Sequence, residues 1–213
     1  MEERKAAPPE FTLSLLADRS SVKEIVKAVL HTIFFHRYFT AVTPVTVDVC
    51  DMTLPGIAHD AELAVLIDAR AATLAEHFSS SSPSSPSAPP RGTLVLQFLE
   101  RRRRPSTTTT AVVKGWFATT RPAAARDEDL VWETWSVEVV LACPRTDTEV
   151  VKARRAMESS LSLAVRKVVD VVNRERGHIP PITTNESNPF PYQILVNPKS
   201  SVSEGWGARQ GIF

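Results

Sequence analysis

The amino-acid sequence predicts a single α+β domain, with a mostly antiparallel sheet and three main helices packed on one face of it. Apolar residues recur at helical spacing in three segments and alternate with polar residues in several shorter ones. The expected elements run helix, strand, helix, three strands, long helix and strand, without the regular alternation of a parallel sheet. The chain has 213 residues, 43% of them hydrophobic, which suffices for one packed core.

The first helix is predicted after Ser21 and Glu24, which have the spacing of a capping box. Its apolar stripe recurs at intervals of three and four and comprises Val22, Ile25, Val26, Val29, Leu30 and Ile33. Val45, Val47 and Val49 alternate with polar residues and predict a half-buried strand.

A second helix is marked by apolar residues between Leu63 and Phe78. The segment 79–92 that follows consists mostly of Ser and Pro, and it buries too little apolar surface to offset its ordering entropy. We predict a disordered insert there. It lies inside the domain, because neither half of the chain holds a self-sufficient set of elements.

The second half of the chain predicts strands around one long helix. Leu94, Leu96 and Phe98 alternate in one strand, and a short apolar run ends at Trp116. The strongest strand covers 130–143 and divides its residues between two faces. The first face carries Trp135, Val137, Val139 and Leu141, and the second carries Trp132, Thr134, Ser136 and Glu138.

The long helix opens at a second capping box, Thr146 to Glu149, and ends before Pro180, with Gly177 as the expected residue just past its end. A last strand is expected between Phe190 and Val196. The domain therefore covers 11–196, between a flexible N-terminus (1–10) and a polar C-terminal tail (197–213).

Composition and motifs indicate a protein without a reaction centre. The net charge is +1, so no long-range field favours nucleic acid or an acidic membrane. No phosphate-binding loop, nucleophile elbow or zinc-ligand spacing occurs, which predicts a non-enzyme without cofactor or metal. Asp127, Glu128 and Asp129 are expected in a solvated turn. No apolar run approaches the ~20 residues of a membrane span, and no signal peptide is visible, which predicts a cytoplasmic or nuclear protein.

Two features indicate contact surfaces. Arg101–Arg104 could meet phosphates, but the run lacks interleaved aromatic residues, and a solvated strand end that guards a sheet edge is the favoured interpretation. Trp116 and Phe117 are adjacent in a polar stretch, so in a strand their rings point to opposite faces. Exposed rings of this kind anchor protein contacts. The alternative is that one ring fills the core and the other lies along the surface.

Three segments resemble the autophagy-related protein 101 family, namely 26–37 (Val-Lys-Ala-Val-Leu-His-Thr-Ile-Phe-Phe-His-Arg), 132–139 (Trp-Glu-Thr-Trp-Ser-Val-Glu-Val) and 189–194 (Pro-Phe-Pro-Tyr-Gln-Ile). The resemblance covers about residues 11–196. Trp116 and Phe117 fall where this family carries an exposed aromatic loop called the WF finger, although the two aromatic residues are adjacent here and often separated in the family.

The resemblance implies a HORMA domain and a non-enzymatic adaptor of the autophagy-initiation kinase complex. Such an adaptor binds and stabilises the HORMA domain of autophagy-related protein 13, through the long helix and nearby sheet elements. The finger recruits downstream factors to autophagosome formation sites. The alternative is a HORMA-type peptide-capturing switch of checkpoint or DNA-repair signalling, which the short polar tail disfavours.

Overall fold

Three helices and six strands make up the part of the chain that the computed structural model describes, residues 7–58, 60–80, 89–103, 127–183 and 188–198. The elements in chain order are β1 (Glu10–Ala17), α1 (Val22–Arg37), β2 (Thr43–Val49), β3 (Met52–Ala58), α2 (Ala61–Ser80), β4 (Arg91–Arg103), β5 (Asp127–Leu141), α3 (Asp147–Arg174) and β6 (Tyr192–Val196). This arrangement confirms the α+β class. The expected strand that ended at Trp116 and most of the expected Ser/Pro insert, residues 81–88, lie outside the described residues.

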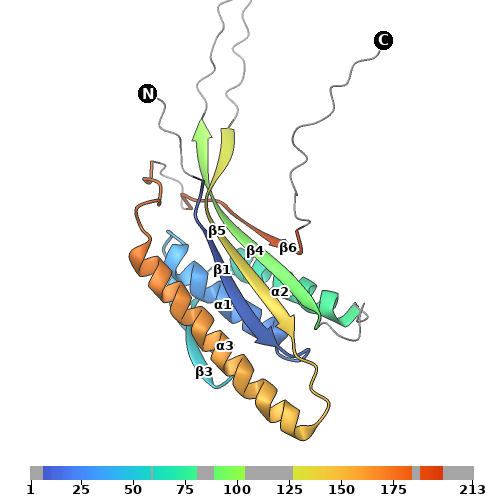
Figure 1. Ribbon diagram of the computed structural model, residues 1–213. Helices are drawn as coiled ribbons and strands as arrows, with labels where there is room; N and C mark the ends of the chain where they lie inside the picture. The colour runs from blue at the N-terminus through green and yellow to red at the C-terminus, as the bar shows by residue number, and fades with distance from the viewer. Residues whose placement is uncertain (1–6, 59, 81–88, 104–126, 184–187, 199–213) are drawn as a thin grey trace, which may run out of the picture.

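The main sheet has four strands in the order β1-β5-β4-β6 (Figure 1). The pairs β5–β4 and β4–β6 are antiparallel, whereas β1 is parallel to β5. The strands β2 and β3 form a separate antiparallel hairpin. The sheet is therefore mixed, and most of its pairs are antiparallel as predicted.

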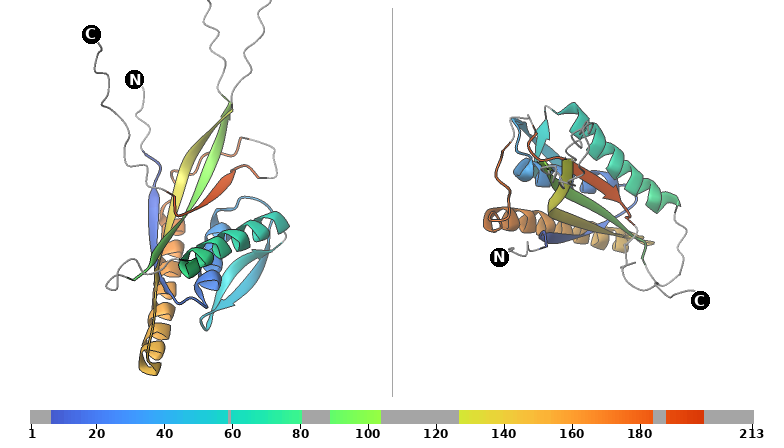
Figure 2. Two further views of the ribbon diagram at one scale, coloured as in Figure 1. Left: turned by 90° about the vertical axis from the view of Figure 1, so that its right-hand side faces the viewer. Right: turned by 90° about the horizontal axis from the view of Figure 1, so that it is seen from above.

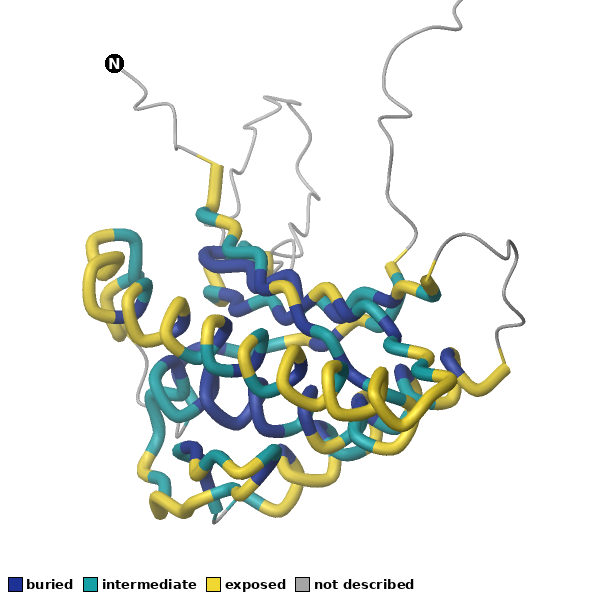
Figure 3. Tube along the Cα trace, turned by 60° about the horizontal axis from the view of Figure 1, so that its bottom comes forward, coloured by how far each residue is buried: buried dark blue, intermediate teal, exposed yellow. Residues whose placement is uncertain are grey.

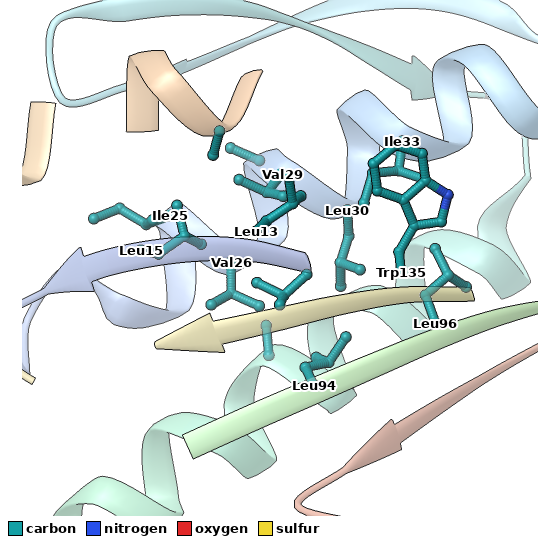
Figure 4. Packing of buried hydrophobic residues seen from close by; sticks show 14 of the residues in the cluster. Leu13, Leu15, Ile25, Val26, Val29, Leu30, Ile33, Leu94, Leu96 and Trp135 are labelled. Carbon is teal, nitrogen blue, oxygen red and sulfur yellow. The ribbon is translucent and has the colours of Figure 1, made fainter. Parts of the chain in front are cut away.

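Helix α1 is the centre of the helical layer. It contacts α2 and α3 on its two sides and the β2–β3 hairpin below, while α3 runs along β1 (Figure 2). The face of α1 toward the sheet packs against β1, β5 and β4 (Figure 4), through Val26, Leu30 and Ile33 against Leu13, Leu15, Leu94, Leu96 and Trp135. Exposed residues follow the outward side of α3, whereas α1 is buried around most of its circumference (Figure 3).

The two predicted helix starts have different outcomes. At α3 the capping box is confirmed, because the Thr146 hydroxyl accepts from the backbone N–H of Glu149 at 3.3 Å and the Glu149 carboxylate accepts from that of Thr146. At α1 the prediction is wrong. Ser21 makes no side-chain cap, and the Asp18 carboxylate instead accepts from the backbone N–H of Ser20 and Ser21 at 3.0 and 2.8 Å. Desolvation by burial acts to raise the pKa of Asp18, but the hydroxyls of Ser21 and Ser20 also donate to this carboxylate, and together with the backbone bonds they lower its pKa.

Side chains of α3 cover the outer edge of β1. Lys167 Nζ donates to the carbonyl of Thr12 at 2.6 Å, and the hydroxyl of Ser160 accepts from the N–H of Leu16 at 3.0 Å. Exposed edge groups of a sheet offer a template for another strand. Along this edge the helix supplies partners for two of those groups instead.

A β-bulge interrupts the pairing of β4 with β5. Phe98 is opposite Glu133 and Leu99 is opposite Val131, so Trp132 has no partner on β4. A bulge re-aims the side chains on either side of it. Trp132 is 6% exposed and packs against Phe98 and Phe190, with ring centroids 5.5 and 5.2 Å away. Because of the bulge, the placement of Trp132 on the second face of a regular strand is wrong.

Candidate functional site

Strands β4 and β5 continue beyond the other strands of the sheet. Strand β6 starts opposite Phe98, and β1 starts opposite Thr134. Residues 99–103 and 127–131 therefore form a two-stranded ribbon that projects from the sheet (Figure 1). We refer to these residues as the ribbon. Because the ribbon ends in the pair Arg103 and Asp127, the segment that carries Trp116 and Phe117 starts and ends at its tip. Both aromatic residues themselves lie outside the described residues.

Residues of opposite charge are paired across the ribbon, Arg101 with Asp129 and Arg102 with Glu128. The Nε of Arg101 lies 3.7 Å from a carboxylate oxygen of Asp129, and that of Arg102 lies 2.8 Å from one of Glu100. The acidic residues thus begin β5, and the predicted solvated turn is wrong. Exposed ion pairs contribute about 0–1 kcal/mol each. Their consequence here is that Arg101 and Arg102 are each paired with a carboxylate.

A buried carboxylate lies at the root of the ribbon. Glu133 is 0% exposed, and Arg37 Nε donates to both of its oxygens at 3.0 Å. The indole N–H of Trp135 donates to the first oxygen at 2.6 Å, and Nε2 of His178 lies 2.7 Å from the second. We call Arg37, Glu133, Trp135 and His178 the Glu133 hub.

The Glu133 hub connects three separate parts of the fold. Arg37 is in the last turn of α1, Glu133 and Trp135 are on β5, and His178 follows α3. Arg37 also donates through Nη2 to the carbonyl of Glu175 at 2.8 Å, at the end of α3. A buried charge is tolerated only when it is paired and hydrogen-bonded, and both conditions hold here. The arrangement holds elements together, and it presents no nucleophile with a base and an orienting group.

An apolar cleft lies beside the hub, between the ribbon root, the residues before β1 and the segment after α3. Its volume is about 590 Å³. The lining residues are Ala7, Pro8, Pro9, Arg102, Leu130, Val131, Trp132, His178, Ile179, Pro180 and Pro181. We call it the proline cleft, because prolines form two of its walls. Clefts of about 300–1,000 Å³ are large enough to hold a ligand or several side chains of a partner.

Other perturbed ionisable groups lie where α1 meets its neighbours. The Tyr38 hydroxyl donates to the Asp60 carboxylate. Burial, followed by this bond, raises the pKa of Tyr38 far above its usual value, and the same bond lowers the pKa of Asp60. Burial also lowers the pKa of His31 and His36, with further lowering by Lys27 and Arg37 respectively. These groups pack helices and do not converge on a common cavity.

The described residues contain no cluster of three or more His, Cys, Asp or Glu side chains placed to hold a metal ion. Among the same residues, no helix combines the length and the apolarity needed to cross a membrane.

The fold and its surfaces define an α+β domain built on one mixed sheet, with a projecting ribbon and an apolar cleft beside the Glu133 hub. The sequence matches the family described as autophagy-related protein 101 over residues 14–186. It is also 32% identical, over 200 residues, to autophagy-related protein 101 of Schizosaccharomyces pombe (strain 972 / ATCC 24843), covering 92% of this chain and 90% of that protein. The chain therefore belongs to the autophagy-related protein 101 family and has a role in autophagy.

Proposed function

We propose that the chain is a non-enzymatic adaptor of the autophagy-initiation kinase complex, built on a HORMA-type domain. It binds and stabilises the HORMA domain of autophagy-related protein 13, and it recruits downstream factors through Trp116 and Phe117. It acts in the cytoplasm and is recruited to autophagosome formation sites. The observation that carries the proposal is family membership over most of the chain.

Exposed apolar side chains of α3 support a heterodimer at this helix. Eight large apolar side chains are exposed in the described part of the chain, and four of them belong to α3, namely Val150, Val151, Leu163 and Val169. Leu163 is the most exposed of these four, at 64%. Apolar side chains that a monomer leaves open are candidates for contact with a protein partner. We therefore place the pairing surface on α3.

The ribbon supports a separate recruiting surface. It holds both ends of the segment 104–126 at its tip, away from the helical layer (Figure 1). Because the segment that carries Trp116 and Phe117 joins the described body at this tip, we propose that its partner and a partner on α3 bind at the same time. Large aromatic anchors account for much of the binding energy of many interfaces. A single chain can in this way join two proteins.

The test is the double substitution Trp116→Ala and Phe117→Ala. We expect it to leave the unfolding midpoint and the heterodimer with the HORMA domain of autophagy-related protein 13 intact, while recruitment of downstream factors in a pull-down is lost. The matched variant Leu163→Glu is expected to weaken the heterodimer and to leave the fold intact. If the double variant unfolds instead, both rings belong to the core and the finger proposal is wrong.

The alternative function is the peptide-capturing switch of checkpoint or DNA-repair signalling. It requires the C-terminal tail to rearrange around a bound strand. The side chains of α3 that cover the β1 edge make that edge a poor place for an added strand. The adaptor is therefore favoured over the switch.

A further inference from the structure

Hydrogen bonds within the chain hold the walls of the proline cleft in place. The backbone N–H of Thr134 donates to the carbonyl of Pro9 at 3.0 Å, which attaches the N-terminal wall to β5. On the other wall, His178 bonds to Glu133 at 2.7 Å, directly before Ile179 and the two prolines. Proline fixes its own φ and has no N–H to satisfy. An occupant would therefore lose little affinity to ordering the site.

The interior of the cleft is mainly apolar. Leu130 and Val131 of β5 line it together with the Trp132 ring and Ile179. Trp132 is more than nine-tenths buried, and its indole N–H has no hydrogen-bond partner among the described residues. The apolar lining matches a large apolar side chain, and the unpartnered indole N–H can donate to an acceptor on the same occupant.

The permanent charge in the lining is positive. It belongs to Arg102, and none of the described lining residues is a carboxylate. The side chain of Arg102 is about half exposed, and its Nε is paired with Glu100 at 2.8 Å. Its remaining N–H groups can meet a second carboxylate. An occupant with a negative charge beside its apolar anchor is therefore complementary to this site.

We propose that the proline cleft binds a short acidic segment of a partner protein. The segment inserts an aromatic or large aliphatic side chain between the proline walls and places a carboxylate beside Arg102. None of the described lining residues belongs to α3, so the cleft gives the adaptor a contact separate from the proposed pairing surface. The inference goes beyond the proposed function and does not depend on it.

Three capped, fluorescein-labelled peptides test the proposal on the full chain by fluorescence polarisation. The first has the core Glu-Glu-Phe-Leu-Glu, the second replaces each Glu by Lys, and the third replaces Phe and Leu by Ala. We expect the first peptide to bind at least about tenfold more tightly than either of the others. Equal binding of the acidic and basic peptides, or no binding of the first at millimolar concentration, overturns the proposal.

Neighbouring arginines provide a matched pair of variants. Arg102→Glu is expected to weaken binding of the first peptide by about tenfold or more, whereas Arg101→Glu carries the same charge change on a residue that does not line the cleft. The Arg101→Glu variant should bind the first peptide with an affinity within about twofold of that of the unsubstituted chain. Equal losses in the two variants would assign the effect to overall charge and overturn the site. Both variants should keep the heterodimer, so a failure here is distinguishable from a failure of the proposed function.

A truncated chain tests whether the protein fills its own cleft. Residues 199–213 include Trp206, Ile212 and Phe213, which are apolar residues that could compete with a partner. Removal of these residues should leave the affinity for the first peptide unchanged. A tenfold gain would show that the tail occupies the cleft, and the assignment to a partner segment would then be wrong.

Discussion

At the scale of single residues, Glu133 has the most demanding environment in the described structure. It is a carboxylate with no exposed surface, and the Arg37 side chain beside it is only 3% exposed. Because water solvates neither charged group, Arg37 and Glu133 depend on each other for stabilisation, and Glu133 also depends on Trp135 and His178. Replacing a whole buried pair by apolar groups is often neutral, whereas removing one partner is strongly destabilising.

We predict that Glu133→Gln lowers the free energy of unfolding by about 3 kcal/mol or more, because it leaves the buried Arg37 without a counter-charge. The measurement is urea denaturation of the purified chain followed by far-ultraviolet circular dichroism. Glu138→Gln is the matched control, because Glu138 lies on the same strand and is exposed. It should change the free energy by less than about 0.5 kcal/mol. Equal effects of the two variants would show that the hub is not a stabilising clamp.

The hub also marks the limit of prediction at this scale. The inward positions Trp135, Val137 and Val139 follow from alternation and are confirmed. The meeting of Arg37 with Glu133 does not follow, because the two residues are 96 positions apart and no local pattern pairs them. One signal was available: in the alternating pattern, Glu133 is a charge between Val131 and Trp135 on the apolar face. The bulge at Trp132 left no comparable signal, since it is set by the register with β4.

At the scale of elements, α2 depends on a close approach to β4. A Cβ atom added at Gly92 would lie 2.8 Å from Cδ1 of Leu74 and 2.9 Å from Cζ of Phe78. Real Cβ atoms do not approach other carbon atoms so closely, and both neighbours are fully buried side chains of α2. The missing side chain at Gly92 therefore sets the distance between this helix and the sheet.

We predict that Gly92→Ala destabilises the fold by about 1–3 kcal/mol, because α2 must shift or its side chains must leave their rotamers. Thermal or urea unfolding measures the loss, and hydrogen exchange should show faster opening of α2 in particular. Gly177→Ala is the control, since a Cβ there meets no atom within 4 Å. A Gly92→Ala chain as stable as the control would mean that α2 adapts to the added methyl group without cost.

The elements that the sequence predicts correctly are those with long, regular patterns, namely the three helices, β4, β5 and β6. Strand β1 was missed, although Leu13, Leu15 and Ala17 alternate, because apolar residues also occur between them at Leu16 and the partner is a distant strand. Of the β2–β3 hairpin, the alternation of Val45, Val47 and Val49 predicts β2, whereas β3 is missed. The turn between the two strands places Cys50 and Asp51 at positive φ. Glycine is the usual sequence signal of such a turn, and neither of these positions is a glycine.

At the scale of the whole molecule, the last described strand, β6, ends before the C-terminal tail. Among the described residues, the last with a backbone bond to the sheet is Asn197, whose N–H donates to the carbonyl of Thr93 at 2.7 Å. The side-chain oxygen of Asn197 accepts in return from the N–H of Thr93 at 2.8 Å. The buried residues of the described core likewise end at Ile194. All described strands of the sheet thus end before the C-terminal tail.

An adaptor and a switch that captures a peptide under its own tail differ in what the tail contributes to partner binding. We predict that a chain ending at Pro198 keeps its free energy of unfolding within about 0.5 kcal/mol, because the truncation removes no described contact. It should also bind the HORMA domain of autophagy-related protein 13 with unchanged affinity, since the proposed pairing surface is on α3. Urea denaturation and isothermal titration calorimetry measure the two quantities. A truncated chain that folds normally but no longer binds that domain would identify the tail as part of the binding device, and the peptide-capturing switch would then be the better account of this molecule.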